Sequence, residues 1–172
     1  KINSLCDKEV IANLYEASCA GVKIELVIRG ICCLKAGIPG LSENITVHSI
    51  VGNFLEHARI LYVENDGSPE VYMGSADWMP RNLDKRVEIM FPVEDPELKR
   101  QVIHILQVQL EDNVKAHVLQ PDGTYEKIDK RGKVLVCAQE QFCEEAIAMA
   151  KKAAEEAGHD VHNTRVFLPD EA

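Results

Sequence analysis

Residues 54–66, FLEHARILYVEND, begin with a histidine and an arginine two residues apart and continue as an apolar run of β type. Alternate side chains of a strand share a face, so the sequence predicts His57 and Arg59 as neighbours, with Ala58 and Ile60 on the opposite face. A histidine can exchange a proton near neutral pH, and an adjacent guanidinium can hold an anion while favouring the neutral imidazole. The alternative is a histidine hydrogen-bonded in the core beside a surface arginine, and the pair taken alone favours that alternative.

The rest of the chain alternates helix and strand patterns around this stretch. Apolar spacing and capping residues predict helices over residues 6–20, from Asp95 through DPELKRQVIHILQVQLED, and over about 139–157. Runs of β type are VKIELVIR, ITVHSIV, HARILYVE, EVYMGS and RVEIMFPV, and KAHVLQ leads into a hairpin-like turn at PDGTY. The pattern predicts an α/β domain with a central mixed β-sheet flanked by helices.

Size and composition limit the class of protein. A chain of 172 residues suits one domain, which we assign to residues 1–172, with about 126–172 as its C-terminal helical extension. No apolar run approaches the roughly 20 residues of a membrane span, and the start KINSLCDKEV lacks the apolar core of a secretory signal. We therefore expect a cytoplasmic protein.

Charge and cysteine content narrow the choice of ligand. The net charge of -9 argues against a general nucleic-acid binder, so an anionic ligand would need a local cationic cluster. The six cysteines lack the spacing of a disulfide framework or a zinc site, and we expect them to be reduced packing residues.

Residues 74–88, GSADWMPRNLDKRVE, gather polar groups directly after one predicted strand and into the next. Arg86 and Glu88 are predicted to share a strand face, Arg81 and Arg86 could neutralise an anion, and Ser75 and Asn82 could supply or orient hydrogen bonds. The alternative is a surface lattice of ion pairs with Asp77 as a helix cap. No metal ligands are identifiable in the sequence.

Arg29 ends an apolar strand and precedes Gly30, where a backbone can approach a ligand closely. It opens the 16-residue segment RGICCLKAGIPGLSEN, which is too long for a simple connection and too apolar for disorder. Ligands of open α/β sheets bind at strand ends, so Arg29 is a candidate for anion binding.

Three runs, RGICCLKAGIPGLSEN, FLEHARI and GSADWMPRNLDKRVE, together resemble the C-terminal catalytic domain of the long-chain polyphosphate kinases, a family with the phospholipase D fold. The resemblance extends from about Asn3 to Tyr125 and more loosely through the last helix. In the superfamily a histidine, a basic residue two positions later and a Gly-Ser-x-Asn element build half of a phosphate site. Here they fall on His57, Arg59 and GSAD, with arginine in place of lysine and Asp77 in place of asparagine.

The resemblance implies a function and partners. The expected reaction is reversible transfer of the terminal phosphate of ATP to polyphosphate through a phosphohistidine. The family carries that histidine on a preceding domain, and this chain contains no copy of that domain. The family further implies ATP or ADP and polyphosphate as substrates, Mg²⁺ as cofactor, the preceding domains as partners, a homo-oligomer, and an optional peripheral association with the inner membrane. The chain would then be a fragment of a longer protein.

The resemblance also suggests site residues. His57 resembles the second active-site histidine, a general acid or electrostatic helper, and Arg29 and Glu88 match positions of the nucleotide and phosphate pocket. Arg59, Arg81 and Arg86 come from the residue pattern described above. The other histidines are assigned to structure or solvent: His48, His104, His117, His159 and His162.

Two other functions remain open at this point. One is a phospholipase D-like phosphodiesterase in which a homodimer pairs two copies of His57. The other is a phosphate- or nucleotide-binding module without turnover.

Overall fold

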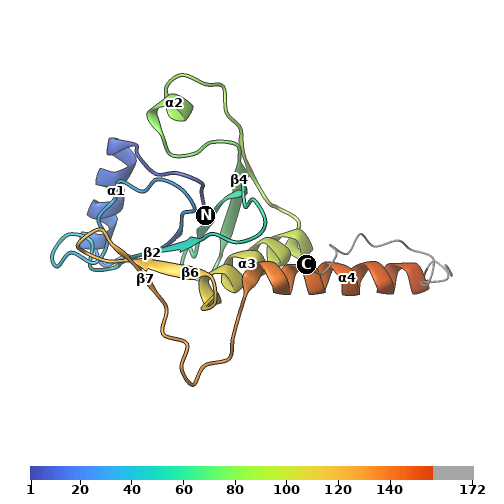
Figure 1. The fold of residues 1–172 in the computed structure, drawn as a ribbon. Coiled ribbons are helices and arrows are strands. Elements are labelled where there is room, and N and C mark those ends of the chain that lie inside the picture. Colours follow the sequence, from blue (N-terminus) through green and yellow to red (C-terminus); the bar gives the residue numbers. More distant parts are fainter. Residues whose placement is uncertain (157–172) are drawn as a thin grey trace. The chain divides into compact units, whose positions relative to one another are not determined.

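A computed structural model describes residues 1–156, which contain seven strands and four helices (Figure 1). The chain separates into two compact units, residues 1–138 and 139–172, and the first contains all strands of the described part. In chain order the elements are α1 (Lys8–Cys19), β1 (Ile24–Val27), β2 (Ile45–Ile50), β3 (Arg59–Val63), β4 (Glu70–Gly74), α2 (Pro80–Leu83), β5 (Met90–Pro92), α3 (Pro96–Glu111), β6 (Ala116–Leu119), β7 (Tyr125–Lys127) and α4 (Ala138–Glu156).

The larger sheet is mixed and has the strand order β1-β2-β6-β7. β1 and β2 run parallel, whereas β6 pairs antiparallel with β2 and β7 pairs antiparallel with β6. The β6–β7 connection turns through Gly123, whose φ of +89° lies in the left-handed region that glycine adopts without strain. The predicted turn at PDGTY is therefore confirmed.

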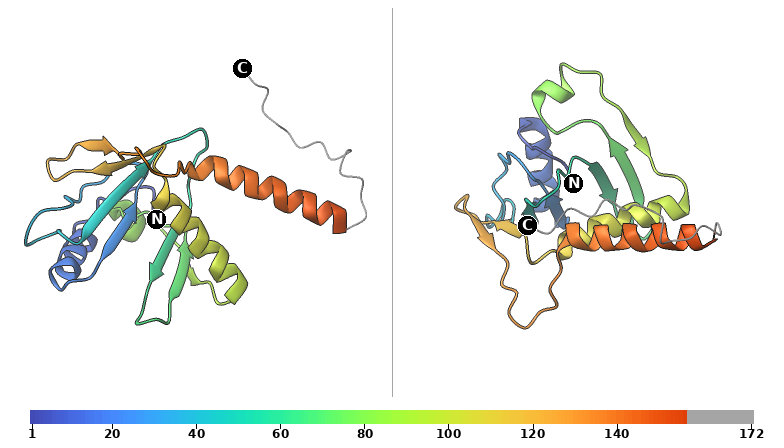
Figure 2. Two further views of the ribbon diagram at one scale, coloured as in Figure 1. Left: turned by 90° about the horizontal axis from the view of Figure 1, so that it is seen from below. Right: turned by 45° about the vertical axis from the view of Figure 1, so that its right-hand side comes forward.

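Helices cover both faces of this sheet (Figure 2). On one face Leu26 and Val47 belong to a core cluster that apolar residues of α1 complete. On the other face Val27 and Ile50 pack with Leu110 of α3. A sheet buried on both faces needs apolar residues at consecutive positions, which explains the nearly continuous apolar run of β1.

A second, antiparallel sheet has the order β3-β4-β5 and packs against α3. Ile60 of β3, Val71 of β4 and Val93, which directly follows β5, form one buried cluster with Val102 of the helix. The sequence pattern predicted one central sheet, and the structure divides the strands between two. A mixed sheet with flanking helices, the predicted class, is present.

The N-terminal seam, which we define as residues 1–5, runs between the two sheets. The backbone N–H of Ile2 donates to the carbonyl of Val27, the last residue of β1, at 3.1 Å, and the N–H of Ile60 in β3 donates to the carbonyl of Lys1 at 2.8 Å. Leu5 forms isolated parallel bridges with Cys32 and with Trp78. The seam thus joins segments that are far apart in the sequence and brings Asn3 between them.

Two of the predicted strands begin later than expected. β3 starts at Arg59, so His57 precedes the strand and is exposed, and β5 starts at Met90, so Arg86 and Glu88 are outside it. The reason is the length of their common partner, because β4 ends at Gly74, which pairs with both Arg59 and Met90. The predicted strand faces of these pairs are wrong.

The cysteines form no disulfide among the described residues, as expected. Their packing role is only partly right, because Cys19, Cys33 and Cys143 are exposed. The segment after Arg29 is ordered, since Leu34 and Ser42 within it are buried.

α4 forms the described part of the second unit and matches the helix predicted at about 139–157. His159 and His162 are outside the described residues. The assignment of residues 1–172 to one domain with an extension from about 126 stays a prediction. Within residues 1–156, no helix combines the length and apolar character that crossing a bilayer requires.

Candidate functional site

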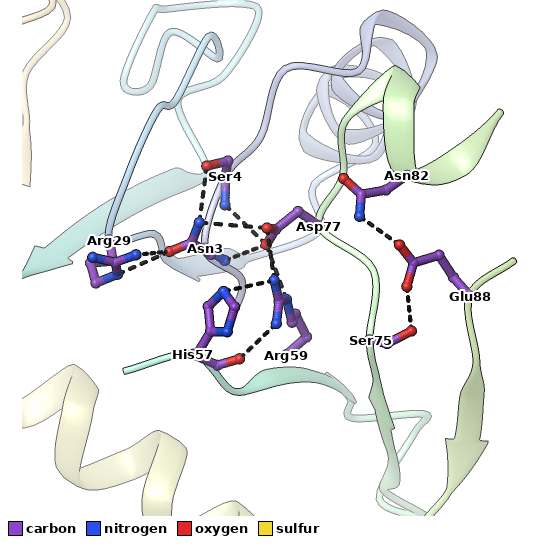
Figure 3. Close-up of polar contacts among 9 residues, drawn as sticks. All are labelled: Asn3, Ser4, Arg29, His57, Arg59, Ser75, Asp77, Asn82 and Glu88. Atoms are coloured by element: carbon purple, nitrogen blue, oxygen red, sulfur yellow. Dashed lines mark hydrogen bonds and ion pairs between the residues drawn. The ribbon is translucent and has the colours of Figure 1, made fainter. Parts of the chain in front are cut away.

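The site is built around an ion pair between Arg59, the first residue of β3, and Asp77, which follows β4 (Figure 3). Arg59 Nε lies 3.2 Å from Asp77 Oδ1, and Arg59 Nη2 lies 2.9 Å from Oδ2. The side chains are only 16% and 3% exposed, respectively. Two-pronged geometry of this kind is the arrangement that best compensates the burial of both charges.

Asp77 is further held by the N-terminal seam. Its Oδ1 accepts the backbone N–H of Asn3 at 2.8 Å and that of Ser4 at 3.2 Å. Burial alone would raise the pKa of Asp77, but the hydrogen bonds from Arg59, Asn3 and Ser4 outweigh it, and the net pKa is lowered. Asp77 therefore stays ionised at neutral pH. It does not cap a helix, because α2 begins after Met79 without a side-chain cap.

His57 lies against Arg59, as the sequence predicted, although not on a strand. Its Nε2 is 3.1 Å from Arg59 Nη2, and its carbonyl oxygen accepts from Arg59 Nη1 at 3.0 Å. Because a guanidinium can only donate, Nε2 is the acceptor, and the proton of the neutral ring is assigned to Nδ1. The second ring nitrogen makes no hydrogen bond with any part of residues 1–156.

Arg29, just beyond β1, approaches from the other side of the seam. Its Nε donates to Asn3 Oδ1 at 2.9 Å, and its Nη2 donates to the same oxygen. No carboxylate of the described residues pairs with Arg29, so its charge is held in place but not neutralised. Asn3 was missed by the sequence reasoning, and no local signal points to it, because its partners are 26 and 74 residues away.

Glu88 belongs to a second bonded group. Its Oε1 accepts from Asn82 Nδ2 at 2.6 Å, its Oε2 accepts from the hydroxyl of Ser75, and that hydroxyl accepts the N–H of Ile89 at 3.0 Å. The hydrogen bond from Ser75, then that from Asn82, and then the nearby positive charges lower the pKa of Glu88. The carboxylate is therefore ionised and oriented.

Arg81 and Arg86 are exposed and make no hydrogen bond or ion pair within residues 1–156. The structure thus brings His57, Arg59 and Arg29 into one bonded group and Glu88 into a second group beside it (Figure 3). Arg81 and Arg86 belong to neither group within residues 1–156. A fixed, unneutralised guanidinium next to a histidine with a donor nitrogen suits the binding of an anion.

The described residues hold no group of three or more His, Cys, Asp or Glu side chains that could bind a metal ion. The side chains present therefore do not form a metal cage.

Comparison with known proteins gives one consistent result. The family model "Polyphosphate kinase C-terminal domain 2" matches residues 1–139. The chain is 49% identical to a polyphosphate kinase of Lactiplantibacillus plantarum over 98% of its own length and 23% of the relative's. It is 56% identical to polyphosphate kinase 1 of Chlorobaculum tepidum over 83% of its length and 20% of the relative's.

The fold agrees with a solved structure. The crystal structure of polyphosphate kinase from Porphyromonas gingivalis matches with a TM-score of 0.80 at 44% sequence identity, covering 91% of this chain and 23% of that one. The predicted α/β fold of phospholipase D type is thereby confirmed. The chain spans less than a quarter of the length of each of these proteins.

Proposed function

This chain belongs to the polyphosphate kinase family, as a C-terminal domain, and on that premise we propose that it supplies half of an active site for reversible phosphoryl transfer between ATP and polyphosphate. The other half, with the histidine that carries the phosphoryl group, belongs to a preceding domain. Phosphoryl transfer needs accurate positioning and neutralisation of charge more than further covalent chemistry. The present half would serve those needs.

The observation that carries this proposal is the contrast between Arg29 and Arg59. Arg59 is neutralised by Asp77 and in turn holds His57, whereas Arg29 keeps its charge and is steadied by a neutral carboxamide. Arg29 is then the cation that binds a phosphate oxygen, and the Nδ1–H of His57 is the hydrogen-bond donor that stabilises charge on a second oxygen during transfer.

The remaining predicted residues have subsidiary parts. An ionised Glu88 would repel phosphate, so we assign it to a donor group of the nucleotide. Arg81 and Arg86 would attract polyphosphate from solution by long-range charge. The described residues hold no ligand cluster for the Mg²⁺ ion expected of the family, and we assign it no ligand among them.

The proposal includes the setting of the domain. We expect it to act in the cytoplasm as one domain of a longer chain that forms a homo-oligomer. The family also allows peripheral association with the inner membrane. The longer chain, the homo-oligomer and the membrane association rest on the family alone.

The test replaces His57 by Gln in the full-length enzyme. Turnover in both directions should fall by about 10²–10⁴, the range covered by the loss of a catalytic hydrogen-bond donor or proton-handling group, while the protein stays folded because His57 is exposed. His117→Gln is the matched control. His117 lies in β6, and within residues 1–156 its Nδ1 hydrogen-bonds the carbonyl of Lys115 at 3.1 Å, so activity should be kept.

Phosphate labelling distinguishes His57 from the histidine that carries the phosphoryl group. With ATP labelled at the γ-phosphate, the peptide containing FLEHAR should carry no label under alkaline conditions that preserve phosphohistidine. Label on His57 would reverse the roles of the two halves. Hydrolysis of a simple phosphodiester that depends on His57, without phosphotransfer, would favour the phosphodiesterase alternative instead.

A further inference from the structure

The backbone of Asn3 is held in place independently of its side chain. Its N–H donates to Asp77 Oδ1 at 2.8 Å, and its carbonyl accepts the N–H of Gly30 at 2.8 Å. A Cβ at position 30 would lie 2.9 Å from that carbonyl oxygen, so the close approach depends on glycine. The starting point of the Asn3 side chain is therefore set by two segments that both carry site residues.

The side-chain carboxamide of Asn3 lies between Arg29 and Asp77 and contacts both (Figure 3). Oδ1 accepts from Nε and Nη2 of Arg29, while Nδ2 lies 3.5 Å from Asp77 Oδ2 and 3.4 Å from Ser4 Oγ. A carboxamide offers an acceptor and a donor on one short side chain and carries no charge. An aspartate here would neutralise Arg29 and face Asp77 with like charge.

We propose that Asn3 is a positioning residue that couples Arg29 to the Arg59–Asp77 pair and orients Arg29 without neutralising it. An incoming anion then meets a guanidinium that is already ordered and still fully charged. This inference rests on the proposed function, because it gives Asn3 its role through Arg29.

The test is a double-mutant cycle in the full-length enzyme. Asn3→Ala should weaken ATP binding about tenfold, as expected for the loss of hydrogen bonds to a charged group, with a smaller change in kcat. Its backbone bonds to Asp77 and Gly30 remain, so the fold should persist. In an Arg29→Ala background, Asn3→Ala should have little further effect on the Kd for ATP.

The control is Asn44→Ala. Asn44 also bridges distant segments by its carboxamide, donating to the carbonyl of Ser18 at 2.9 Å, but it lies at the opposite end of β2 from the site. Its replacement should leave the Kd for ATP unchanged. Asn3→Ser is the second variant of the cycle, because its hydroxyl is too short to bridge the two groups and it serves if the alanine protein does not fold.

The outcomes separate the two proposals. Additive effects of the two substitutions, or an unchanged Kd in both Asn3 variants while Arg29→Ala weakens binding, would overturn the role of Asn3 alone. If Arg29→Ala itself leaves ATP binding and turnover unchanged, the proposed function of this site fails, and the role of Asn3 fails with it.

Discussion

At the scale of single residues, the site contrasts two arginines in opposite electrostatic surroundings. Arg59 meets a buried carboxylate, and Arg29 meets an amide oxygen. An arginine that is already paired with a carboxylate contributes little to the binding of an anionic ligand, whereas an ordered and unpaired arginine contributes most. The sequence suggested both arginines but could not distinguish them, because the difference is made by Asn3 and Asp77 from remote parts of the chain.

The first residue-scale prediction concerns Arg29→Ala in the full-length enzyme. Loss of the unpaired cation should lower kcat/KM for ATP at least tenfold, about 1.4 kcal/mol, as measured by steady-state kinetics. Stability should change little, because the lost partner is an uncharged carboxamide. Arg131→Ala removes an exposed cation paired with Asp129 and should leave the kinetics unchanged. Kinetics of Arg29→Ala equal to those of the control would return Arg29 to a structural role.

The second residue-scale prediction concerns Asp77→Asn and pH. The pKa of Asp77 is lowered in the folded state, so its ion pair stabilises the fold fully above the unfolded-state pKa and is lost as pH falls through the folded value. At pH 7 the substitution should cost about 3 kcal/mol, since it leaves Arg59 partly buried without its carboxylate. Below about pH 4 the difference from the unmodified protein should shrink.

Urea unfolding at a series of pH values measures this difference. Asp129→Asn is the control, because Asp129 also pairs with an arginine but its side chain is 61% exposed. That variant should change stability only slightly. A penalty for Asp77→Asn that stays constant down to pH 3 would show that the charge of Asp77 does not stabilise the fold.

At the scale of elements, helices were predicted more accurately than strands for a physical reason. The bounds of α1 and α3 follow local signals, with Asp7 and Asp95 accepting the backbone N–H groups of their first turns. The starts of β3 and β5 depend on where β4 ends, and no residue near His57 or Glu88 records that position. The sequence could therefore predict that His57 lies beside Arg59, but not the backbone conformation that places it there.

Asp112 gives the element-scale prediction. It is fully buried after α3, its Oδ1 accepts the N–H groups of Val114, Lys115 and Ala116, and its Oδ2 accepts that of Ala138 at 2.8 Å. Asp112→Ala removes the carboxylate that accepts the N–H groups of Ala116 and Ala138 in buried hydrogen bonds, and it should destabilise the domain by about 3 kcal/mol or more in chemical unfolding.

The comparison is Asp95→Ala at the exposed start of α3. Asp95 accepts two N–H groups at 2.9 Å each, and water can replace it there, so about 1 kcal/mol should be lost. Equal losses at the two positions would mean that burial of the donors does not set the cost.

At the scale of the whole molecule, an acidic chain presents a cationic site. The net charge is -9, yet Arg29 and Arg59 belong to the bonded group, and Arg86 lies close enough to Glu88 for its charge to lower the pKa of that carboxyl. The sequence predicted this concentration of charge because the residues occur in three runs. The seam that unites the runs was not foreseen, since residues 1–5 contact segments on both sides only after the two sheets have formed.

The final prediction concerns the 172-residue chain alone. Three buried clusters hold the first unit together, so the isolated chain should fold and unfold cooperatively. It spans 23% of the polyphosphate kinase of Lactiplantibacillus plantarum, and its motif histidine is proposed to support the reaction, not to carry the phosphoryl group. We therefore expect negligible formation of polyphosphate from ATP, or of ATP from polyphosphate, at protein concentrations where the full-length enzyme turns over readily. Turnover by the chain that persists after further purification and is abolished by His57→Gln would contradict the split site, because one half would then be sufficient for the chemistry.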